Sequence, residues 1–555
     1  MIVNRFNFRA FDVLLLLSVC LVLYFFDLGR APFFDKQEPR EALVVWEINH
    51  SGSWILPLRN GNEIPSKPPL YHWLAALVSQ ALSQMNEFTI RFPSALLATI
   101  GVLLVYLAGA GRWSRAAGLI SAMVLATSYE WRQAAKAARV DMTLTFALLC
   151  AFLYFLHLYR HRGGRMKWMI LGIFLGLATV AKGPLGIVVP CFAFSIFLCL
   201  QRDTAFVKKI NFLVLICTWA VLAGSWYALA LWQGGGEFLD VVIKENFSMV
   251  IGQDAGHPHG FFWYVPAFFQ NAAPWSLFIF PIAIWLYKSR RQLAQDDTLY
   301  FVVWFLAVFV FFSAFTQKRS VYILGSYPAF ALLFGGWFQK LNTAESASGR
   351  FLAKAAGYLS AAAFLLLSAV LLVQVAQPGL ATLIGSGLRP KDQAQMLILG
   401  KLLSEHRSIV YLWAVFCGLG GIVLIVVLTK TAWRPYFACM IGLMVVSMVF
   451  EQRFDNYLAE QYSYKAFMQR VLAIVKDDPL YFYREGDFGA TFYANKRITT
   501  LDKPVPKESS RFYLLCWESD WRELSDQSGL SLAYVSESTD RQNPARGHLY
   551  LIKGH

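Results

Sequence analysis

Charged residues are scarce in this chain of 555 residues: Asp, Glu, Lys and Arg make up 15%, whereas hydrophobic residues make up 57% and aromatic residues 16%. Soluble domains carry about 25% charged residues, so water cannot be the main solvent of this protein. Apolar runs of about 17–23 residues recur from the N-terminus to about Met448, and a helix of that length crosses a hydrocarbon layer of roughly 30 Å. The composition therefore predicts a polytopic membrane protein.

Nucleotide, zinc-protease and thiol motifs are also missing. The chain has no Gly-x-x-x-x-Gly-Lys-Ser/Thr loop, no Gly-x-Gly-x-x-Gly fingerprint and no His-Glu-x-x-His pair, which argues against nucleotide hydrolysis and zincin proteolysis. Of the eight cysteines, only Cys516 lies in the polar C-terminal part, a pattern that argues against a disulfide framework or a thiolate metal cluster. Much of the net charge of +15 falls in short loops between apolar runs, where it orients a membrane protein and gives little support to nucleic-acid binding.

The apolar runs predict thirteen transmembrane helices. They lie near 11–27, 92–110, 116–130, 142–160, 168–181, 184–200, 212–232, 266–287, 299–315, 321–339, 355–374, 408–429 and 434–450. No small-residue cleavage site follows the first run, so we expect a retained helix rather than a signal peptide. The run Leu70–Leu82 is short and follows Lys67-Pro68-Pro69, which favours an interfacial helix.

The basic loops set the expected orientation. If the N-terminus is cytoplasmic and Leu70–Leu82 does not cross, the Arg- and Lys-rich loops all fall on the cytoplasmic side. The outer side then receives the loops 28–91, 131–141 and 233–265 and the segment 452–555. We expect an all-α transmembrane domain over 1–451 and a small α/β domain over 452–555. Its expected strands are Leu480–Tyr483, Phe512–Cys516 and Leu549–Ile552.

Candidate catalytic residues cluster in the first and second outer loops. Asp35, Glu38 and Arg40 lie in the first loop, and Arg139 and Asp141 end the second, where a span begins. Carboxylates at a membrane surface can act as bases, and Arg can hold phosphate oxygens. An ionisable group at the mouth of a helix bundle is costly to desolvate, which makes it a functional candidate. The alternative is that these are solvated loop charges and that Asp141 caps a helix.

Further candidate binding residues lie in other outer connections, where they would surround the mouth of the bundle. They are Lys67, Lys182, Lys318, Arg319 and Tyr322. Such a ring of cations suits a substrate with a lipid tail and a phosphate head, although lysines that snorkel to the interface would look the same. His257 and His259 could bind a phosphate or a metal, but no further ligands cluster with them. An aromatic-rich interfacial loop is the alternative for that segment.

The order of these motifs resembles the GT-C glycosyltransferases. The acidic first loop with its nearby Arg is followed by Ser-Gly-x-Trp-Ile-x-Pro at 51–57, Lys-Pro-Pro-Leu at 67–70, Arg-Phe-Pro-Ser at 91–94, and the Arg and Asp of the second loop. The similarity covers roughly the first 330 residues and includes Lys182-Gly183 and the pair Lys318 and Tyr322. Within the family the chain is most similar to the group of the 4-amino-4-deoxy-L-arabinose lipid A transferase (ArnT) and the protein O-mannosyltransferases.

The resemblance implies a multi-pass enzyme of a bacterial inner membrane, with a periplasmic active site and a periplasmic C-terminal domain. It implies a polyprenyl phosphate–sugar donor and an acceptor that is lipid A or another envelope component, among membrane lipids and without nucleic acid. No cofactor is obligatory, and the residues do not support a divalent metal. The first-loop acid is the leading catalytic candidate and Asp141 supports it, while Lys67, Lys182 and Lys318 bind the donor phosphate.

The chain departs from the family at one position. Counting back from Ser51-Gly52, the family's Asp-Glu-x-x-Arg/Tyr pattern places Gln37 where the leading Asp is expected, with Glu38 and Arg40 retained. Either Glu38 takes the catalytic role, which we favour, or Asp35 reaches the site by another loop path. The departure weakens the implication that the sugar is aminoarabinose.

Two rival functions remain at the level of the sequence. A protein O-mannosyltransferase would share the fold and the donor type, but its large inserted sugar-binding domain is not visible in any loop. A lipid or solute transporter would carry polar residues at the midplane of broken helices and often a repeat of its halves. Here the charges gather in the outer loops and no repeat is evident.

Overall fold

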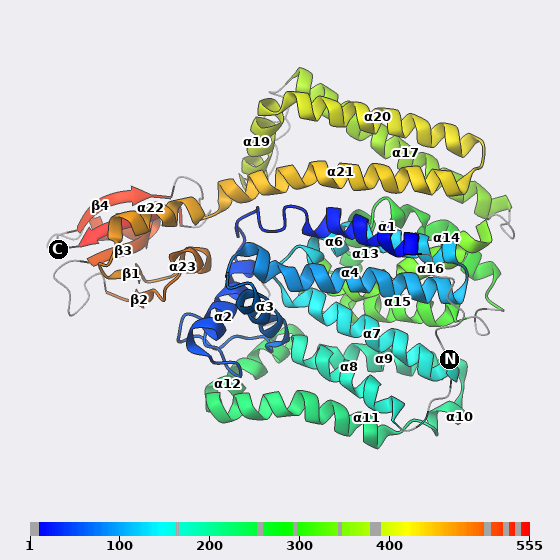
Figure 1. Cartoon of the computed structure of the whole chain (residues 1–555), viewed down its shortest axis with the longest axis horizontal. Helices are drawn as coiled ribbons and strands as arrows, with labels where there is room; N and C mark the ends of the chain where they lie inside the picture. The colour runs from blue at the N-terminus through cyan, green and yellow to red at the C-terminus, as the bar shows by residue number, and fades with distance from the viewer. Residues whose placement is uncertain are drawn as a thin grey trace.

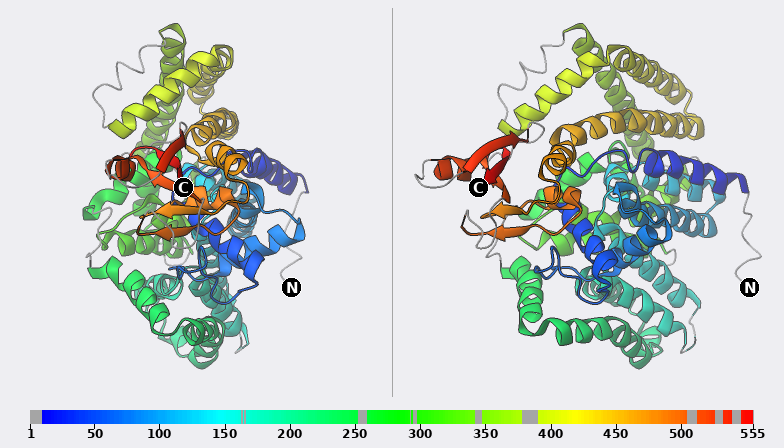
Figure 2. Two further views of the ribbon diagram at one scale, coloured as in Figure 1. Left: turned by 90° about the vertical axis from the view of Figure 1, so that its left-hand side faces the viewer. Right: turned by 60° about the vertical axis from the view of Figure 1, so that its left-hand side comes forward.

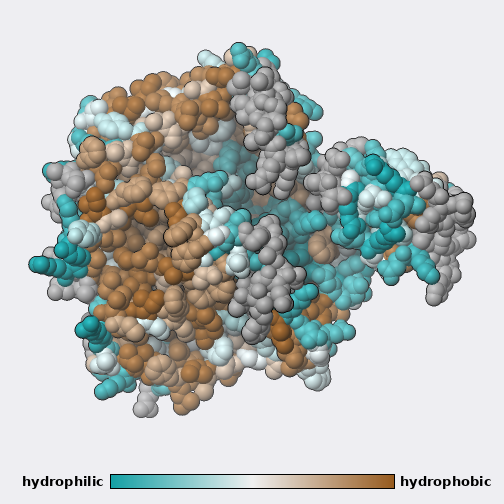
Figure 3. Space-filling model, turned by 180° about the vertical axis from the view of Figure 1, so that it is seen from behind, coloured by the Kyte–Doolittle hydropathy of each residue, from teal (hydrophilic) through white to brown (hydrophobic). Residues whose placement is uncertain are grey.

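The protein is a bundle of long helices with a small sheet domain at one end (Figure 1). The computed structural model describes residues 10–161, 164, 166–251, 259–291, 293, 297–341, 347–377, 390–503, 512–525, 532–538 and 546–554. Apolar side chains cover the outer face of the bundle, whereas polar side chains gather in a hollow beside the sheet domain (Figure 3). This distribution fits a bundle surrounded by lipid.

Each of the thirteen predicted apolar runs lies on one or more helices of the bundle. The helices are α1 (Ala10–Cys20), α2 (Gln37–Ser51), α3 (Leu70–Ala81), α4 (Glu87–Arg112), α5 (Arg115–Ala126), α6 (Tyr129–Ala135), α7 (Val140–His161), α8 (Lys167–Lys182), α9 (Leu185–Gln201), α10 (Thr204–Val207), α11 (Phe212–Trp219), α12 (Ser225–Ile251), α13 (Tyr264–Asn271), α14 (Ile279–Lys288), α15 (Thr298–Ser313), α16 (Tyr327–Leu341), α17 (Ala347–Ala376), α19 (Pro390–Glu405), α20 (Arg407–Thr429) and α21 (Trp433–Tyr462). Short π segments are η2 (Leu21–Phe25) and η3 (Ala220–Gly224), and short 3-10 segments are η4 (Phe261–Trp263), η5 (Trp275–Phe278) and η6 (Ser320–Ser326).

The number of membrane crossings follows from length and apolar composition. Within the described ranges, seven helices are long enough and apolar enough to cross a membrane. The number is eight if the bent pair Phe261–Asn271 and Trp275–Lys288 is one span. Four shorter apolar helices accompany them: Ala10–Phe25, Arg115–Ala126, Leu185–Gln201 and Thr298–Ser313. The protein is therefore a helical multi-pass membrane protein, and the count of thirteen stays a prediction. Helix α3 has 12 residues and is not among the candidate spans, in agreement with the interfacial helix expected at Leu70–Leu82.

Local sequence signals set the ends of the helices that carry the outer loops. Asn86 accepts a hydrogen bond from the backbone N–H of Thr89, whose side chain bonds back to Asn86, and this capping box begins α4. Helix α2 ends at Gly52, which has a φ of 71°, a left-handed conformation that glycine adopts at little steric cost. These caps let a short extended segment join α2 to α3 at the end of the bundle.

Three segments differ from the predicted topology. The predicted loop 233–265 is helical as far as Ile251, because α12 continues past a non-helical backbone turn at Gly235. The predicted span 266–287 consists of two helical pieces that meet at 112°. The apolar helix of the predicted span 116–130 ends at Ala126, and residues from Tyr129 form the separate helix α6. The length of the apolar runs alone does not reveal these breaks, because helical segments on either side of them contain apolar and aromatic residues.

The C-terminal domain contains a five-stranded mixed sheet. Its strands are β1 (Leu480–Tyr483), β2 (Thr499–Leu501), β3 (Phe512–Trp517), β4 (Leu532–Glu537) and β5 (Leu549–Gly554), in the order β2-β1-β3-β5-β4. β1 pairs in parallel with β2 and β3, whereas β5 pairs in antiparallel fashion with β3 and β4. The helices α22 (Lys465–Val475), α23 (Phe488–Ala494) and α24 (Glu518–Ser525) complete the domain. The three predicted strands are confirmed, and helix α21 continues through residue 452 to Tyr462.

The two ends of the bundle differ in charge and in contacts. Helix α4 has 26 residues and therefore spans roughly 39 Å. At its first residue, Glu87 pairs with Lys465 of the C-terminal domain at 2.8 Å. At its last residue, Arg112 pairs with Asp297 at 3.3 Å, and Arg160 pairs with the same carboxylate. The basic loops predicted to be cytoplasmic thus lie at the end opposite the C-terminal domain (Figures 1 and 2).

Candidate active site

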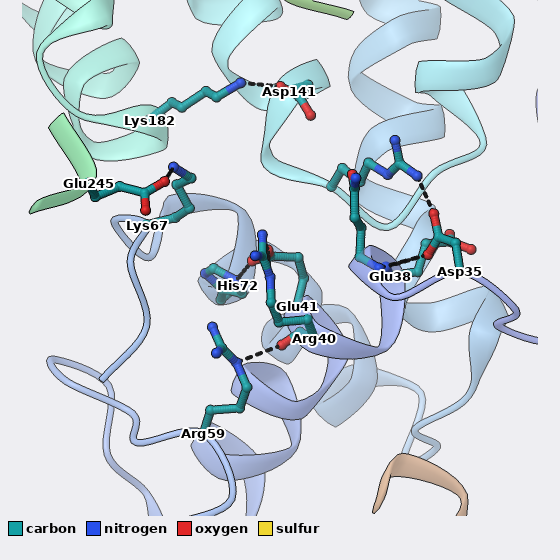
Figure 4. A network of polar contacts seen from close by, with 12 residues as sticks. Asp35, Glu38, Arg40, Glu41, Arg59, Lys67, His72, Asp141, Lys182 and Glu245 are labelled. Carbon is teal, nitrogen blue, oxygen red and sulfur yellow. Dashed lines mark hydrogen bonds and ion pairs between the residues drawn. The ribbon is translucent and has the colours of Figure 1, made fainter. Parts of the chain in front are cut away.

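Helix α2 presents a row of buried carboxylates to the neighbouring helices. Glu38, Glu41 and Glu47 are all buried, although α2 lies in a segment that the sequence describes as a polar outer loop. Glu38 pairs with Arg91 and Glu47 with Arg497, both from other segments. Glu41 is bonded by Arg40 of the same helix and by His72 of α3 (Figure 4). Buried charges are stable only when paired in this way, so these pairs fix the position of α2 at the mouth of the bundle.

Glu38 forms a two-bond ion pair with Arg91 of α4. The Arg91 Nε and Nη2 atoms donate to its carboxylate at 2.8 and 2.7 Å, and the backbone N–H of Ala138 donates to it at 2.8 Å. Glu38 is 5% exposed and Arg91 4%. These partners favour a positioning role for Glu38, while its predicted catalytic role stays a prediction.

Asp35 begins α2 and joins it to the second outer loop. Its carboxylate accepts the backbone N–H groups of Gln37 and Glu38 at 2.9 and 2.8 Å, which is the bonding of a helix cap. The same carboxylate pairs with Arg139. Burial lowers the pKa of Arg139 and the charge of Asp35 raises it; the net result is a raised pKa. Asp35 therefore lines the larger cavity with its oxygens already bonded, and the hypothesis that it acts in catalysis stays a prediction.

Glu41 is the centre of a second buried pair. The ring Nε2 of His72, on α3, lies 2.8 Å from its carboxylate, and Arg40 donates to its other oxygen from 2.9 Å. Burial alone would raise the pKa of Glu41, but the hydrogen bond from His72 and the charges of Arg40 and Arg59 hold that pKa well below its usual range. Glu41 and His72 were not among the predicted site residues. The only sequence signal for them is their place beside Arg40 and after Lys-Pro-Pro-Leu.

A polar cavity of about 340 Å³ opens beside these pairs. Its described lining brings together six cations and three carboxylates from six segments of the chain: Arg40, Lys67, Arg139, Lys182, Lys244 and Arg319 with Glu41, Asp141 and Glu245. Tyr322 and Gln37 also line it. The sequence predicted this convergence of Lys67, Arg139, Asp141, Lys182, Arg319 and Tyr322, and the geometry confirms that they share one cavity.

Two ion pairs organise the cations of this cavity. Lys182, the last residue of α8, pairs with Asp141 at the start of α7, and its ammonium lies 4.7 Å from the centre of the Tyr322 ring. Lys67 pairs with Glu245 of α12. Burial and the nearby charge of Lys182 lower the pKa of Lys67 more than Glu245 raises it. An anion that entered the cavity would relieve this crowding of positive charge.

A larger cavity of about 600 Å³ adjoins the first. Five residues line both: Gln37, Arg139, Asp141, Val321 and Arg319. Asp35, Glu38, His259 and Lys318 line the larger one. The Lys318 ammonium donates to the backbone oxygens of Ser313, at 2.9 Å, and of Phe315, and the His259 ring stacks on Trp263 with 4.6 Å between centroids. His257 lies outside the described residues.

Three residues of the larger cavity were missed by sequence reasoning. Glu130 and Gln133 lie on α6, and Lys136 follows its last residue. Burial and the charge of Arg132 lower the pKa of Lys136 to about 8, and burial raises the pKa of Glu130 to about 7. Their spacing in a short polar segment gave no motif. Among the described residues, no group of three or more His, Cys, Asp and Glu is arranged to hold a metal ion.

Comparison with known proteins agrees with this arrangement. Residues 66–227, which contain Lys67, Arg139, Asp141 and Lys182, match the family model described as dolichyl-phosphate-mannose-protein mannosyltransferase. The fold is similar to that of ArnT from Cupriavidus metallidurans bound to undecaprenyl phosphate, with a TM-score of 0.78 at 18% identity over 97% of both chains. The matched segment and the fold are both similar to those of the GT-C glycosyltransferases.

Curated relatives of this chain are distant in sequence. An undecaprenyl phosphate-α-4-amino-4-deoxy-L-arabinose arabinosyl transferase of Pseudomonas savastanoi pv. phaseolicola is 29% identical over 67% of this chain and 69% of its own length. An uncharacterized protein of Aquifex aeolicus is 28% identical over 58% of this chain and 62% of its own length. The match to these relatives thus spans about two thirds of their length. The comparisons thus show an ArnT-like fold over 97% of the chain and a mannosyltransferase-type segment at residues 66–227.

Proposed function

We propose that this chain transfers a sugar from a polyprenyl phosphate donor to a cell-envelope acceptor at the outer face of a bacterial inner membrane. The observation that carries the proposal is the 340 Å³ cavity, in which six cations and Tyr322 converge at the mouth of an apolar bundle. A phosphodiester headgroup suits such a cavity, because Lys and Arg donate charge-assisted hydrogen bonds to its oxygens. Its lipid tail would lie against the apolar face of the bundle (Figure 3).

The chemistry of the donor explains the need for cations. When the bond between the anomeric carbon and the phosphate oxygen breaks, the departing polyprenyl phosphate gains negative charge and the sugar gains positive character. Lys67, Lys182 and Arg319 would stabilise the departing phosphate more than the intact donor, which accelerates the reaction. The proposed step is a single displacement with inversion at the anomeric carbon, and it uses neither a nucleotide nor a metal.

The arabinosyl transferase relative supports an aminoarabinose donor, and lipid A is the acceptor that the resemblance to the ArnT group implies. Gln37 stands against that sugar, because it lines both cavities at the place where the family pattern has an acidic residue. A second candidate function is transfer of a sugar to a protein hydroxyl. The description of the family model that matches residues 66–227 favours it.

Purified protein in nanodiscs tests the proposal directly. Synthetic undecaprenyl phosphates that carry aminoarabinose, mannose or glucose would be mixed with lipid A or with an envelope extract, and donor loss and product mass followed by mass spectrometry. We expect one donor to be consumed and its sugar to appear as an added mass on one fraction. If none is consumed by wild-type protein, and envelopes from cells with and without the protein have identical glycan and lipid A masses, the proposal fails.

A further inference from the structure

Glu130 is a buried carboxylate that faces the larger cavity and has no role in holding the helices together by charge. It lies on α6, is 6% exposed and lines the cavity together with Asp141 and Arg139. Its carboxylate accepts a hydrogen bond from the Ser320 hydroxyl, at 3.0 Å. Within the described part of the chain, no ion pair joins it to Lys, Arg or His.

The carboxylates nearer to the smaller cavity are engaged differently. Asp141 is paired with Lys182, and Glu38 with Arg91. Asp35 pairs with Arg139 and caps α2. A carboxylate that is held by a cation and by N–H donors is a weak base, because accepting a proton would break those bonds. Glu130 lacks such bonds, so it can accept a proton at smaller cost.

The electrostatic surroundings of Glu130 agree with its geometry. Burial raises its pKa to about 7, which the Ser320 hydrogen bond moderates. Two charged residues at the start of α7 also act on Glu130: Asp141 raises its pKa, and Arg139, just before the helix, lowers it. Arg91 of α4, already neutralised by Glu38, and Arg319 before η6 also line this cavity. A general base works best when its pKa lies near the operating pH.

We propose, on the basis of the glycosyl transfer proposed above, that Glu130 accepts the proton of an alcohol acceptor bound in the larger cavity. The acceptor oxygen forms the new bond to the anomeric carbon, while the bond from that carbon to the phosphate oxygen breaks. The electron pair leaves with the polyprenyl phosphate, and the hydroxyl proton moves to the Glu130 carboxylate. The five residues that line both cavities would surround the reacting bond.

This assignment selects the chemical class of acceptor. An alcohol needs a base, because its proton must leave as the new bond forms. A phosphate acceptor is already ionised, needs no base and would be repelled by the ionised Glu130. The acceptor is therefore a hydroxyl, whether of a sugar, a lipid or a protein side chain, rather than a phosphate.

The test uses full-length protein in nanodiscs with the panel of undecaprenyl phosphate sugars, and envelope lipids and envelope proteins as separate acceptor fractions. Mild acid distinguishes the products, because a glycosyl phosphate is cleaved by it and a glycoside of an alcohol is not. We expect an acid-stable product, and the fraction that carries it identifies the source of the hydroxyl. An acid-labile glycosyl phosphate would overturn the proposal.

Variants separate a proton acceptor from a residue that only supports the fold. Glu130→Gln keeps the size and the acceptor atom for Ser320, so we expect normal expression and a loss of about 10²-fold or more in rate. The matched control is Glu405→Gln, an exposed carboxylate that lines neither cavity, for which we expect less than a 3-fold change. A wild-type rate in Glu130→Gln would overturn the proposal.

The pH profile gives a second readout. Below pH 7 the wild-type rate should rise about 10-fold per pH unit as Glu130 ionises, and it should level off above that pH. Ser320→Ala removes a hydrogen-bond donor that favours the ionised form of Glu130. The rising part of the pH–rate profile of this variant should therefore move roughly 0.5–1 unit to higher pH, with the plateau retained. An unmoved limb in Ser320→Ala would contradict the assignment. Absence of transfer from every donor by the wild-type protein would instead refute the proposed function.

Discussion

Replacing Glu38 by Gln tests whether a buried carboxylate of the first loop holds the structure together. The change keeps the side-chain volume but removes the charge that faces Arg91. That guanidinium is 4% exposed, so water cannot replace the lost partner. It would keep its hydrogen bonds to the backbone oxygens of Leu28 and Ala31, at 3.1 and 2.6 Å, and its contact with the Phe33 ring.

The expected magnitude follows from these contacts. Two charge-assisted bonds at 2.8 and 2.7 Å are lost or weakened, and the remaining buried charge is uncompensated, which costs about 3–5 kcal/mol. The matched control is Glu405→Gln, because Glu405 forms a surface pair with Lys401 at 3.9 Å, with side chains 45% and 66% exposed. A surface pair of this kind contributes about 0–1 kcal/mol.

The assay is the free energy of unfolding in mixed micelles, measured by titration with denaturing detergent, for the two variants and for the wild type. The double variant Glu38→Gln with Arg91→Met removes both charges and should recover part of the loss. If Glu38→Gln unfolds at the wild-type midpoint but loses transfer activity, the positioning role is refuted and Glu38 becomes the catalytic acid that the sequence favoured.

Three further predictions concern binding and the C-terminal domain. Lys67→Gln should weaken donor binding by about 10-fold or more, measured with undecaprenyl phosphate in nanodiscs, because the cavity loses a buried cation; Lys401→Gln, at an exposed position, should change nothing. Anion binding in the larger cavity should weaken as the pH rises through about 8, because Lys136 then loses its charge, and Lys136→Arg should remove this dependence; an unchanged profile in that variant would exclude Lys136 as the source. Asn60→Ala should loosen the C-terminal domain and speed its release by protease, because Asn60 bonds both the N–H and the oxygen of Ile498, at 3.1 and 2.9 Å; Asn49→Ala, in the same loop region, is the control.

The bundle could be predicted because a membrane imposes a simple rule on the sequence. All thirteen apolar runs form helices, since backbone groups in hydrocarbon must bond within their own segment. The strands Leu480–Tyr483 and Leu549–Ile552 were also visible as short apolar runs in a polar segment. Breaks were not visible: α12 bends at Gly235, inside a run of three glycines that reads equally well as a loop.

The site was predicted in its membership and less well in its bonding. The convergence of Lys67, Arg139, Asp141 and Lys182 was expected from their common side of the membrane, and the cavity unites them. Lys318 and His259 were assigned to the substrate by position, but both line the other cavity. Which ammonium meets which carboxylate depends on helix rotation, and spacing along the chain does not encode it.

The sequence by itself determined the membrane environment, the helical class, and the collection of charges in segments that share one side of the bilayer. It could do so because hydrophobic length and charge are properties of single segments. Only the tertiary structure decided that Glu38 and Glu41 are bonded to partners 53 and 31 residues away, whereas Glu130 is bonded to a hydroxyl. Pairing is a property of two segments at once, so the packing of the helices assigns which acid holds the fold and which is available for chemistry.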